Sequence, residues 1–272
     1  MKSIKSILIQ TSLIIVALGM IFPMFWMLLL SLRENPEKYT SLIQTLQATT
    51  TLKNYTETFI SDAFDTYFIN SLLVGSVVTL GNIIFCFLCG YAFARKDIVG
   101  SKFLFTTILG VLIIPPQVIM IPLYRMMVEF HWINTYYALI IPWLVTPFGI
   151  FLIRQFVQAL PRDMEDAARI DGASEWYIVF RIVMPLCKPV LTVLGIYLFL
   201  SNWNSFLYPF LFTNDEAHRT LPVGLAFYLG KQSIDWGHLM AGASISALPV
   251  LTLFMFFQRQ IIKGLTAGAL KE

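Results

Sequence analysis

Six apolar runs, each long enough to cross a lipid bilayer, are the feature of this sequence that most limits its fold. A transmembrane helix needs about 20 predominantly apolar residues. The chain is 57% hydrophobic and only 13% charged, whereas soluble domains average about 45–50% apolar and about 25% charged residues. The sequence therefore predicts an all-α membrane protein with six transmembrane helices, at 7–32, 68–94, 103–123, 136–157, 186–212 and 240–262.

A long polar segment separates the fourth apolar run from the fifth. Six charged residues fall between Arg162 and Asp171, and the bilayer centre would destabilise each of them by about 3 kcal/mol. Pro161 suits the first turn of a helix, and Gly172 suits the break after it. We therefore expect an aqueous loop at 161–185 that faces a partner.

A second short helix is expected in this loop after Gly172. Ser174 is a favourable N-cap residue. Four apolar residues then follow at the spacing of one helix face: Trp176, Val179, Phe180 and Val183. Pro185 and Pro189 should end this helix and admit the next span. The loop is thus predicted to be a helix-turn-helix between the fourth and fifth transmembrane helices.

The basic residues predict the orientation of the chain. Six spans place both ends and the loops around 95–102 and 154–185 on one side of the membrane. That side carries 13 of the 19 basic residues and leaves 6 outside, so the positive-inside rule assigns it to the cytoplasm. The 13 are Lys2, Lys5, Arg95, Lys96, Lys102, Arg154, Arg162, Arg169, Arg181, Lys188, Arg259, Lys263 and Lys271. Because these charges are dispersed among loops, a nucleic-acid-binding face is disfavoured.

The predicted spans contain no Asp, Glu or His near their middle. Secondary solute carriers usually keep such groups at the midplane, although carbonyls and hydroxyls can hold sodium, so this class remains the alternative. The sequence has no GxxxxGK[ST] motif, and Gly230-Lys231 is followed by Gln232. An ATPase that drives the chain would therefore be a separate polypeptide. A membrane-embedded enzyme ranks third, because no clustered acid, base or metal constellation is found.

The polar loop matches a known signature, EAA---G---------I-LP, with Asp in place of Glu and Met in place of Leu. The matching residues are Asp166-Ala167-Ala168, Gly172, Ile182 and Met184-Pro185. Further likeness runs through Asn70–Leu72, Gly90–Arg95, Asn134–Tyr136, Trp203-Asn204 and 264–269. From about Asn54 to its end, the chain resembles a permease subunit of a bacterial carbohydrate-uptake ABC importer, and more narrowly the smaller membrane subunit of the maltose transporter.

The resemblance implies a division of labour. The chain itself would be no enzyme and would bind no cofactor, since ATP and Mg would be bound by two partner ATPase subunits. A second, homologous permease subunit, an extracytoplasmic sugar-binding protein and membrane lipid would be its other partners, with no nucleic acid. The protein would be a multi-pass component of the bacterial cytoplasmic membrane with both termini in the cytoplasm.

The resemblance also implies where the parts of the chain would lie. Residues 1–272 would form a single transmembrane permease domain. Its parts would be outer loops at 33–67 and 213–239, a cytoplasmic coupling loop at 161–185 and a cytoplasmic tail at 264–272.

The coupling loop would seat in a cleft of one ATPase. Its small residues allow close approach, its carboxylates suit basic partner groups, and Gly172 permits a turn. The expected coupling residues are Glu165, Asp166, Ala167, Ala168, Asp171, Gly172 and Ala173. A solvated connector is the alternative interpretation of the loop.

A polar and aromatic cluster in the fifth run is the candidate translocation pathway. It consists of Asn202, Trp203, Asn204 and Tyr208. Amides can orient hydroxyl-rich ligands, and aromatic faces can stack on sugar rings. Hydrogen bonding between helices is an equally weighted alternative. In the maltose relative the larger partner subunit supplies the transport-site contacts.

Overall fold

The computed structural model describes residues 4–39, 41–61, 63–230 and 234–269. Throughout these residues the fold is helical, and the only β pairing in them is one isolated bridge between Arg33 and Thr50. The chain divides into two compact units. Unit 1 comprises Met1–Phe68 with Leu221–Leu251, and unit 2 comprises Ile69–Thr220 with Thr252–Glu272.

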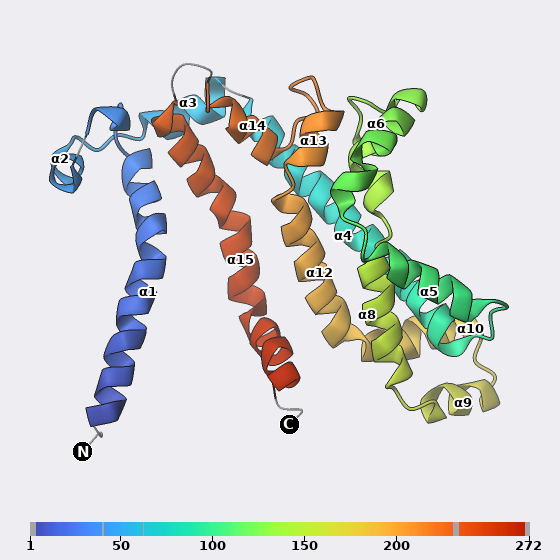
Figure 1. Ribbon diagram of the computed structural model, residues 1–272. Coiled ribbons are helices and arrows are strands. Elements are labelled where there is room, and N and C mark those ends of the chain that lie inside the picture. The colour runs from blue at the N-terminus through green and yellow to red at the C-terminus, as the bar shows by residue number, and fades with distance from the viewer. Residues whose placement is uncertain (1–3, 40, 62, 231–233, 270–272) are drawn as a thin grey trace. The chain divides into compact units, whose positions relative to one another are not determined.

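Figure 1 labels most of the α-helices. Two of them contribute to both units: α4 (Phe64–Arg95) and α15 (Trp236–Ala269). The other helices of unit 1 are α1 (Ile4–Ser31), the short η1 (Pro36–Lys38), α2 (Leu42–Gln47), α3 (Lys53–Ser61) and α14 (Leu221–Phe227). Unit 2 continues with α5 (Ser101–Val111), η2 (Pro116–Ile119), α6 (Met120–Glu129), α7 (Tyr136–Ile140), η3 (Ile141–Trp143), α8 (Pro147–Gln158), α9 (Asp163–Ile170), α10 (Glu175–Tyr177), η4 (Ile178–Val183), α11 (Met184–Leu186), α12 (Lys188–Trp203) and α13 (Leu207–Phe212).

Four helical segments are long and apolar enough to cross a membrane: Lys5–Ser31, Phe64–Arg95, Tyr136–Gln158 and Trp236–Gln260. Two bent pairs would raise the number to six if each pair were one span. The first pair joins Ser101–Val111 to Pro116–Glu129 at 95°, and the second joins Glu175–Leu186 to Lys188–Trp203 at 76°. A multi-pass membrane protein is therefore confirmed in outline, and the count of six stays a prediction.

Breaks interrupt spans that the sequence predicts as continuous. The run 103–123 ends as α5 at Val111 and resumes at Pro116. Pro115 and Pro116 carry no N–H, so neither can donate the hydrogen bond that would continue α5. The run 186–212 is broken again after Trp203, where α12 ends, and α13 starts at Leu207.

The segment of unit 1 that follows α1 is held by polar contacts to backbone carbonyls. The Asn54 side-chain amide donates to the carbonyl oxygens of Ser31, at 2.9 Å, and of Arg33, at 2.8 Å. The buried Arg33 guanidinium donates to Thr50 Oγ1 at 2.7 Å and to the carbonyl oxygen of Ala48. Because these bonds satisfy carbonyls at the end of α1, the predicted outer loop is an ordered structure where it is described.

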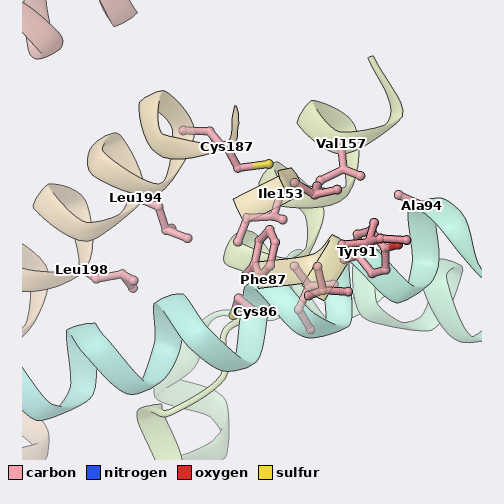
Figure 2. Packing of buried hydrophobic residues seen from close by; sticks show 14 of the residues in the cluster. Cys86, Phe87, Tyr91, Ala94, Ile153, Val157, Cys187, Leu194 and Leu198 are labelled. Atoms are coloured by element: carbon pink, nitrogen blue, oxygen red, sulfur yellow. The ribbon is translucent and has the colours of Figure 1, made fainter. Parts of the chain in front are cut away.

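The main core of unit 2 lies where α4, α8, η4 and α12 pack together. Figure 2 shows Phe87 and Tyr91 from α4 near Ile153 from α8, with Leu194 and Leu198 along α12. Gly90 makes the approach of α4 to α8 possible, since a β-carbon there would lie only 2.8 Å from Ile153 Cγ2. This core fixes the end of α4 against the polar segment that follows α8.

Candidate functional site

The polar segment between α8 and α12 folds as the predicted helix-turn-helix. Helix α9 is followed by Gly172, whose φ of +81° lies in the left-handed region that favours glycine. Ser174 Oγ then accepts a hydrogen bond from the Tyr177 backbone N–H at 3.3 Å and caps α10. Within unit 2, α9 lies beyond the end of α8 (Figure 1). The two predicted helices and the turn are therefore present.

The second helix differs from the predicted regular α-helix. Residues 178–183 form a π-helix, η4, and its wider turn changes which side chains face the core. Val179 and Val183 are buried, whereas Trp176 and Phe180 are exposed and stack on each other with ring centroids 5.8 Å apart. Of the four side chains on the predicted apolar face, the two valines therefore pack into the core and the two aromatic rings lie together at the surface.

The prolines beyond η4 have different positions from those predicted. Pro185 does not end the helix, because it lies in the first turn of α11. Pro189 lies in the first turn of α12, where a missing N–H is tolerated. The next helix thus begins at Lys188, close to the predicted start of the span.

Glu165 fastens α9 to the end of α4. Its Oε1 lies 2.7 Å from Arg95 Nε, and its Oε2 accepts a hydrogen bond from the Tyr91 hydroxyl at 3.0 Å. The Arg95 guanidinium also donates to the Leu160 carbonyl oxygen at 2.8 Å. The side chains of Arg95 and Glu165 are each only 4% exposed. A buried charge of this kind needs its partners, so the contact fixes the position of α9.

A second, exposed group of charges joins α9 to α10. Arg169 bonds to Asp166 Oδ1 at 2.8 Å and to Glu175 Oε1 at 3.0 Å. Lys96 Nζ lies 2.6 Å from the other oxygen of Glu175. The hydrogen bond from Arg169, followed by that from Lys96, lowers the pKa of Glu175 to about 2. The carboxylate of Glu175 is therefore charged throughout the physiological range.

The predicted coupling residues divide by their surroundings. Glu165 and Ala168 are buried within unit 2 and Ala173 is half-buried, so these three position the segment. The outward residues are Asp166, Ala167, Asp171 and Gly172. Next to them Ile170 is 86% exposed. The outer face of α9 thus presents an apolar side chain beside carboxylates.

Sequence reasoning did not find the residues that hold the segment in place. They are Tyr91, Arg95, Lys96, Arg169 and Glu175. A signal was present for two of them, since Gly90–Arg95 was noted as a family-like stretch and its arginine follows an apolar run. A charged residue at the end of a buried helix needs an opposite charge, and the nearest polar loop is where that partner is expected.

The predicted pathway residues do not all lie together. Asn202 and Tyr208 line a cavity of ≈ 230 Å³ in unit 2, with Trp143, Thr146, Ser201 and Ser205 among its other lining residues. Trp203 is buried elsewhere and stacks on Phe199, with centroids 5.7 Å apart. Asn204 donates to the Leu200 carbonyl oxygen at 2.8 Å and does not line the cavity. The sequence analysis did not include Trp143 among the pathway residues, although it lines the cavity and its ring centroid lies 4.7 Å from that of Tyr208.

Residues able to hold a metal ion do not gather in the described part of the chain, which has no group of three or more His, Cys, Asp or Glu side chains suited to one. Cys86, Cys89 and Cys187 are free thiols.

Several relatives are similar over nearly the whole chain. The arabinooligosaccharides transport system permease protein AraQ of Halalkalibacterium halodurans is 36% identical, over 92% of this chain and 91% of the relative. The trehalose/maltose transport system permease protein MalG of Thermococcus litoralis is 34% identical, over 98% of both. The melibiose/raffinose/stachyose import permease protein MelC of Bacillus subtilis is 33% identical, over 94% of both.

A solved structure shares the fold. A chain of a bacterial ABC transporter involved in the import of the acidic polysaccharide alginate superposes with a TM-score of 0.84 at 20% identity, covering 94% of this chain and 96% of that one. The family of binding-protein-dependent transport system inner membrane components matches residues 82–267, which include α9 and most of the residues that line the cavity. The chain belongs to this family of inner membrane transport components.

Proposed function

We propose that this chain is a membrane-spanning permease subunit of an ATP-binding-cassette importer that moves a sugar or oligosaccharide delivered by an extracytoplasmic binding protein. The names of its relatives support a sugar, because AraQ, MalG and MelC are transport components for arabinooligosaccharides, for trehalose or maltose and for melibiose, raffinose or stachyose. The predicted partners are a second, homologous permease subunit and two ATPase subunits that bind ATP and Mg.

The single observation that carries the mechanism is the buried contact of Glu165 with Arg95. It joins a short polar helix to the end of an apolar helix of 32 residues. Coupling between distant sites needs a contiguous packed contact that can transmit motion. A force applied to α9 would reach α4 through a pair of charges that resists separation. We therefore assign α9 as the element that docks on an ATPase.

The outward face of α9 suits a partner cleft. Ile170 offers an apolar side chain that is 86% exposed, and Asp166 and Asp171 offer carboxylates to basic groups. Ala167 allows close approach. Glu165 then acts as a positioning residue, whereas the outward residues would make the docking contact.

Six spans with cytoplasmic termini remain the proposed topology. The coupling loop would lie in the cytoplasm, and the segments 33–67 and 213–239 would lie outside. The proposed tail at 264–272 continues as part of α15 to Ala269, and 270–272 lie outside the described residues.

Uptake by whole cells tests the proposal. The gene is deleted in its native host, and entry of radiolabelled maltose, trehalose, raffinose and arabinotriose is measured at micromolar concentration. We expect uptake of at least one sugar to be lost and to return with the wild-type gene. A second strain expresses this chain alone in a foreign host. Transport by the chain alone would contradict the proposal and favour a secondary carrier.

A further inference from the structure

Three interrupted helices meet at the cavity of unit 2. Pro116 begins η2 after the break that follows α5, Trp143 ends η3 before α8, and Asn202 lies in the last turn of α12. All three residues line the cavity. In hydrocarbon each backbone polar group needs a partner, so non-helical backbone at membrane depth is tolerated only inside protein or beside a water-filled space.

At two of these breaks a side chain forms a hydrogen bond to a backbone carbonyl oxygen. The Tyr208 hydroxyl donates to the Pro116 carbonyl oxygen at 2.6 Å, and the Asn82 amide donates to the Trp143 carbonyl oxygen at 2.9 Å. Thr146 Oγ1 accepts from the Gly149 N–H at 3.2 Å and caps α8. The cavity wall is therefore pre-organised, because the backbone around it is held by specific bonds.

Part of the polar lining has no hydrogen-bond partner of its own. The side chains of Ser201, Asn202 and Ser205 make no hydrogen bond within the part of the chain that the structure describes. Together they offer two hydroxyls and an amide, which both donate and accept. The cavity lining contains no charged residue. This set suits a neutral ligand with many hydroxyl groups.

The aromatic lining supplies the complementary apolar surface. Trp143 and Tyr208 lie edge to face, with an interplanar angle of 60°. Amphipathic rings of this kind present an apolar face beside polar groups, as a sugar ring also does. The volume of ≈ 230 Å³ lies below the range of about 300–1,000 Å³ typical of drug-sized ligands. One ring would fit, and a longer oligosaccharide would extend beyond the cavity.

We propose that this cavity is a subsite for one neutral pyranose ring of the transported sugar, built within this subunit, with Trp143 and Tyr208 against the ring and Asn202, Ser201 and Ser205 on its hydroxyls. The assignment rests on the proposed function as a sugar importer. It adds that this chain contacts the sugar directly and that Trp143, outside the polar cluster of α12, is a binding residue.

Protection from a thiol reagent tests the subsite directly. Cys86, Cys89 and Cys187 are replaced by Ala, and Ser205→Cys is introduced in the complete complex with its partner subunits in nanodiscs. The reagent is 2-sulfonatoethyl methanethiosulfonate, which needs water to reach a thiolate. Val193→Cys, on the preceding helix α12, 39% exposed and not lining the cavity, is the matched control.

The complex is trapped with ATP and vanadate after the binding protein has delivered maltose, trehalose, raffinose or arabinotriose. We expect the sugar that the wild type transports to slow modification of Ser205→Cys about tenfold and to leave Val193→Cys unchanged. An unreactive Ser205→Cys, or equal rates with and without that sugar, overturns the subsite while the proposed function stands. If the wild-type complex transports none of the four sugars, the proposed function fails and the subsite fails with it.

A second pair of variants tests the subsite even if the protein with the introduced cysteine assembles poorly. Trp143→Leu should lower the initial rate of sugar uptake about tenfold, while Trp143→Phe keeps a ring and should retain most of the rate. Equal uptake by the Trp143→Leu variant and the wild type would overturn the subsite.

Discussion

Arg95 Nε lies 2.7 Å from Glu165 Oε1, and this contact joins the end of α4 to the short polar helix α9. Each of the two groups has one more partner: Glu165 accepts a hydrogen bond from the Tyr91 hydroxyl at 3.0 Å, and Arg95 donates one to the Leu160 carbonyl oxygen at 2.8 Å. The pair is thus satisfied although it is buried. Such a pair adds little stability over an apolar replacement, but removing one partner leaves an uncompensated charge.

Breaking this pair should destabilise the protein strongly. We expect Arg95→Met to reduce the free energy of unfolding by about 3–5 kcal/mol, because the buried Glu165 is left with only the Tyr91 hydroxyl and a longer contact to Arg169 at 3.5 Å. The double variant Arg95→Met/Glu165→Leu should recover part of the loss. Thermal unfolding in detergent, followed by near-UV circular dichroism, measures both. The matched control is Lys96→Met, whose exposed partner Glu175 should make the loss at most about 1 kcal/mol.

The pH dependence of the exposed group follows from Glu175. Arg169 and Lys96 hold the pKa of its carboxyl at about 2, below the ordinary 4.5. A lowered pKa means that the carboxylate favours folding above pH 4.5 and that its contribution is lost as the pH falls toward 2. We expect the difference in melting temperature between wild type and Glu175→Gln to be constant from pH 7 to 5 and to shrink below pH 4.5. A difference that grows on acidification would contradict this assignment.

Substitutions at Gly172 separate backbone strain from partner contact. No atom lies within 4 Å of the site where a β-carbon would be added, so a side chain here meets only the strain of a positive φ. That strain costs about 1–2 kcal/mol for most residues, while Asn tolerates the left-handed region. In the proposed complex, Gly172→Asn should keep sugar-stimulated ATP hydrolysis and Gly172→Ala should lose a little. Gly172→Leu should lose most of it, because its bulk also obstructs docking. Equal activity of the three variants would leave α9 as a solvated connector.

The membrane topology is open to a labelling test. Ser174→Cys and Glu216→Cys are made in a background in which the native cysteines are replaced, and intact cells are treated with an impermeant maleimide. Glu216 lies in the segment between α13 and α14, so the six-span topology places it outside and Ser174 inside. We expect labelling of Glu216→Cys in intact cells and of Ser174→Cys only after lysis. Labelling of both in intact cells would reject six spans with cytoplasmic termini.

The sequence predicted well those elements that are determined by interactions between residues close together in the chain. The long apolar runs became α1, α4 and α15, and the pattern around Gly172 and Ser174 became a left-handed turn and a helix cap. These features depend on residues close together in the chain. The sequence predicted less well where packing decides, as in α10 and η4, where Trp176 and Phe180 lie outside the core despite their helical spacing.

Contacts between distant segments were beyond sequence reasoning. Arg95 and Glu165 are separated by 70 residues, and Trp143 and Tyr208 by a similar length of chain. In neither pair does the sequence around the two residues indicate that they are in contact. For the same reason Glu165 was grouped with the residues that face a partner, whereas its carboxylate is buried against α4. Asn204 and Trp203 were placed in the pathway by composition, and the helix geometry directs both away from the cavity.

The most direct test of the central claim is sugar uptake into proteoliposomes that hold the purified complex of this chain with its partner permease and ATPases. Radiolabelled sugar and the binding protein are supplied outside, with ATP inside. We predict accumulation that requires both the binding protein and ATP, and that falls to background with Asp166→Lys, which reverses an exposed charge on α9. Accumulation without ATP, or full uptake with Asp166→Lys, would contradict an importer driven through α9.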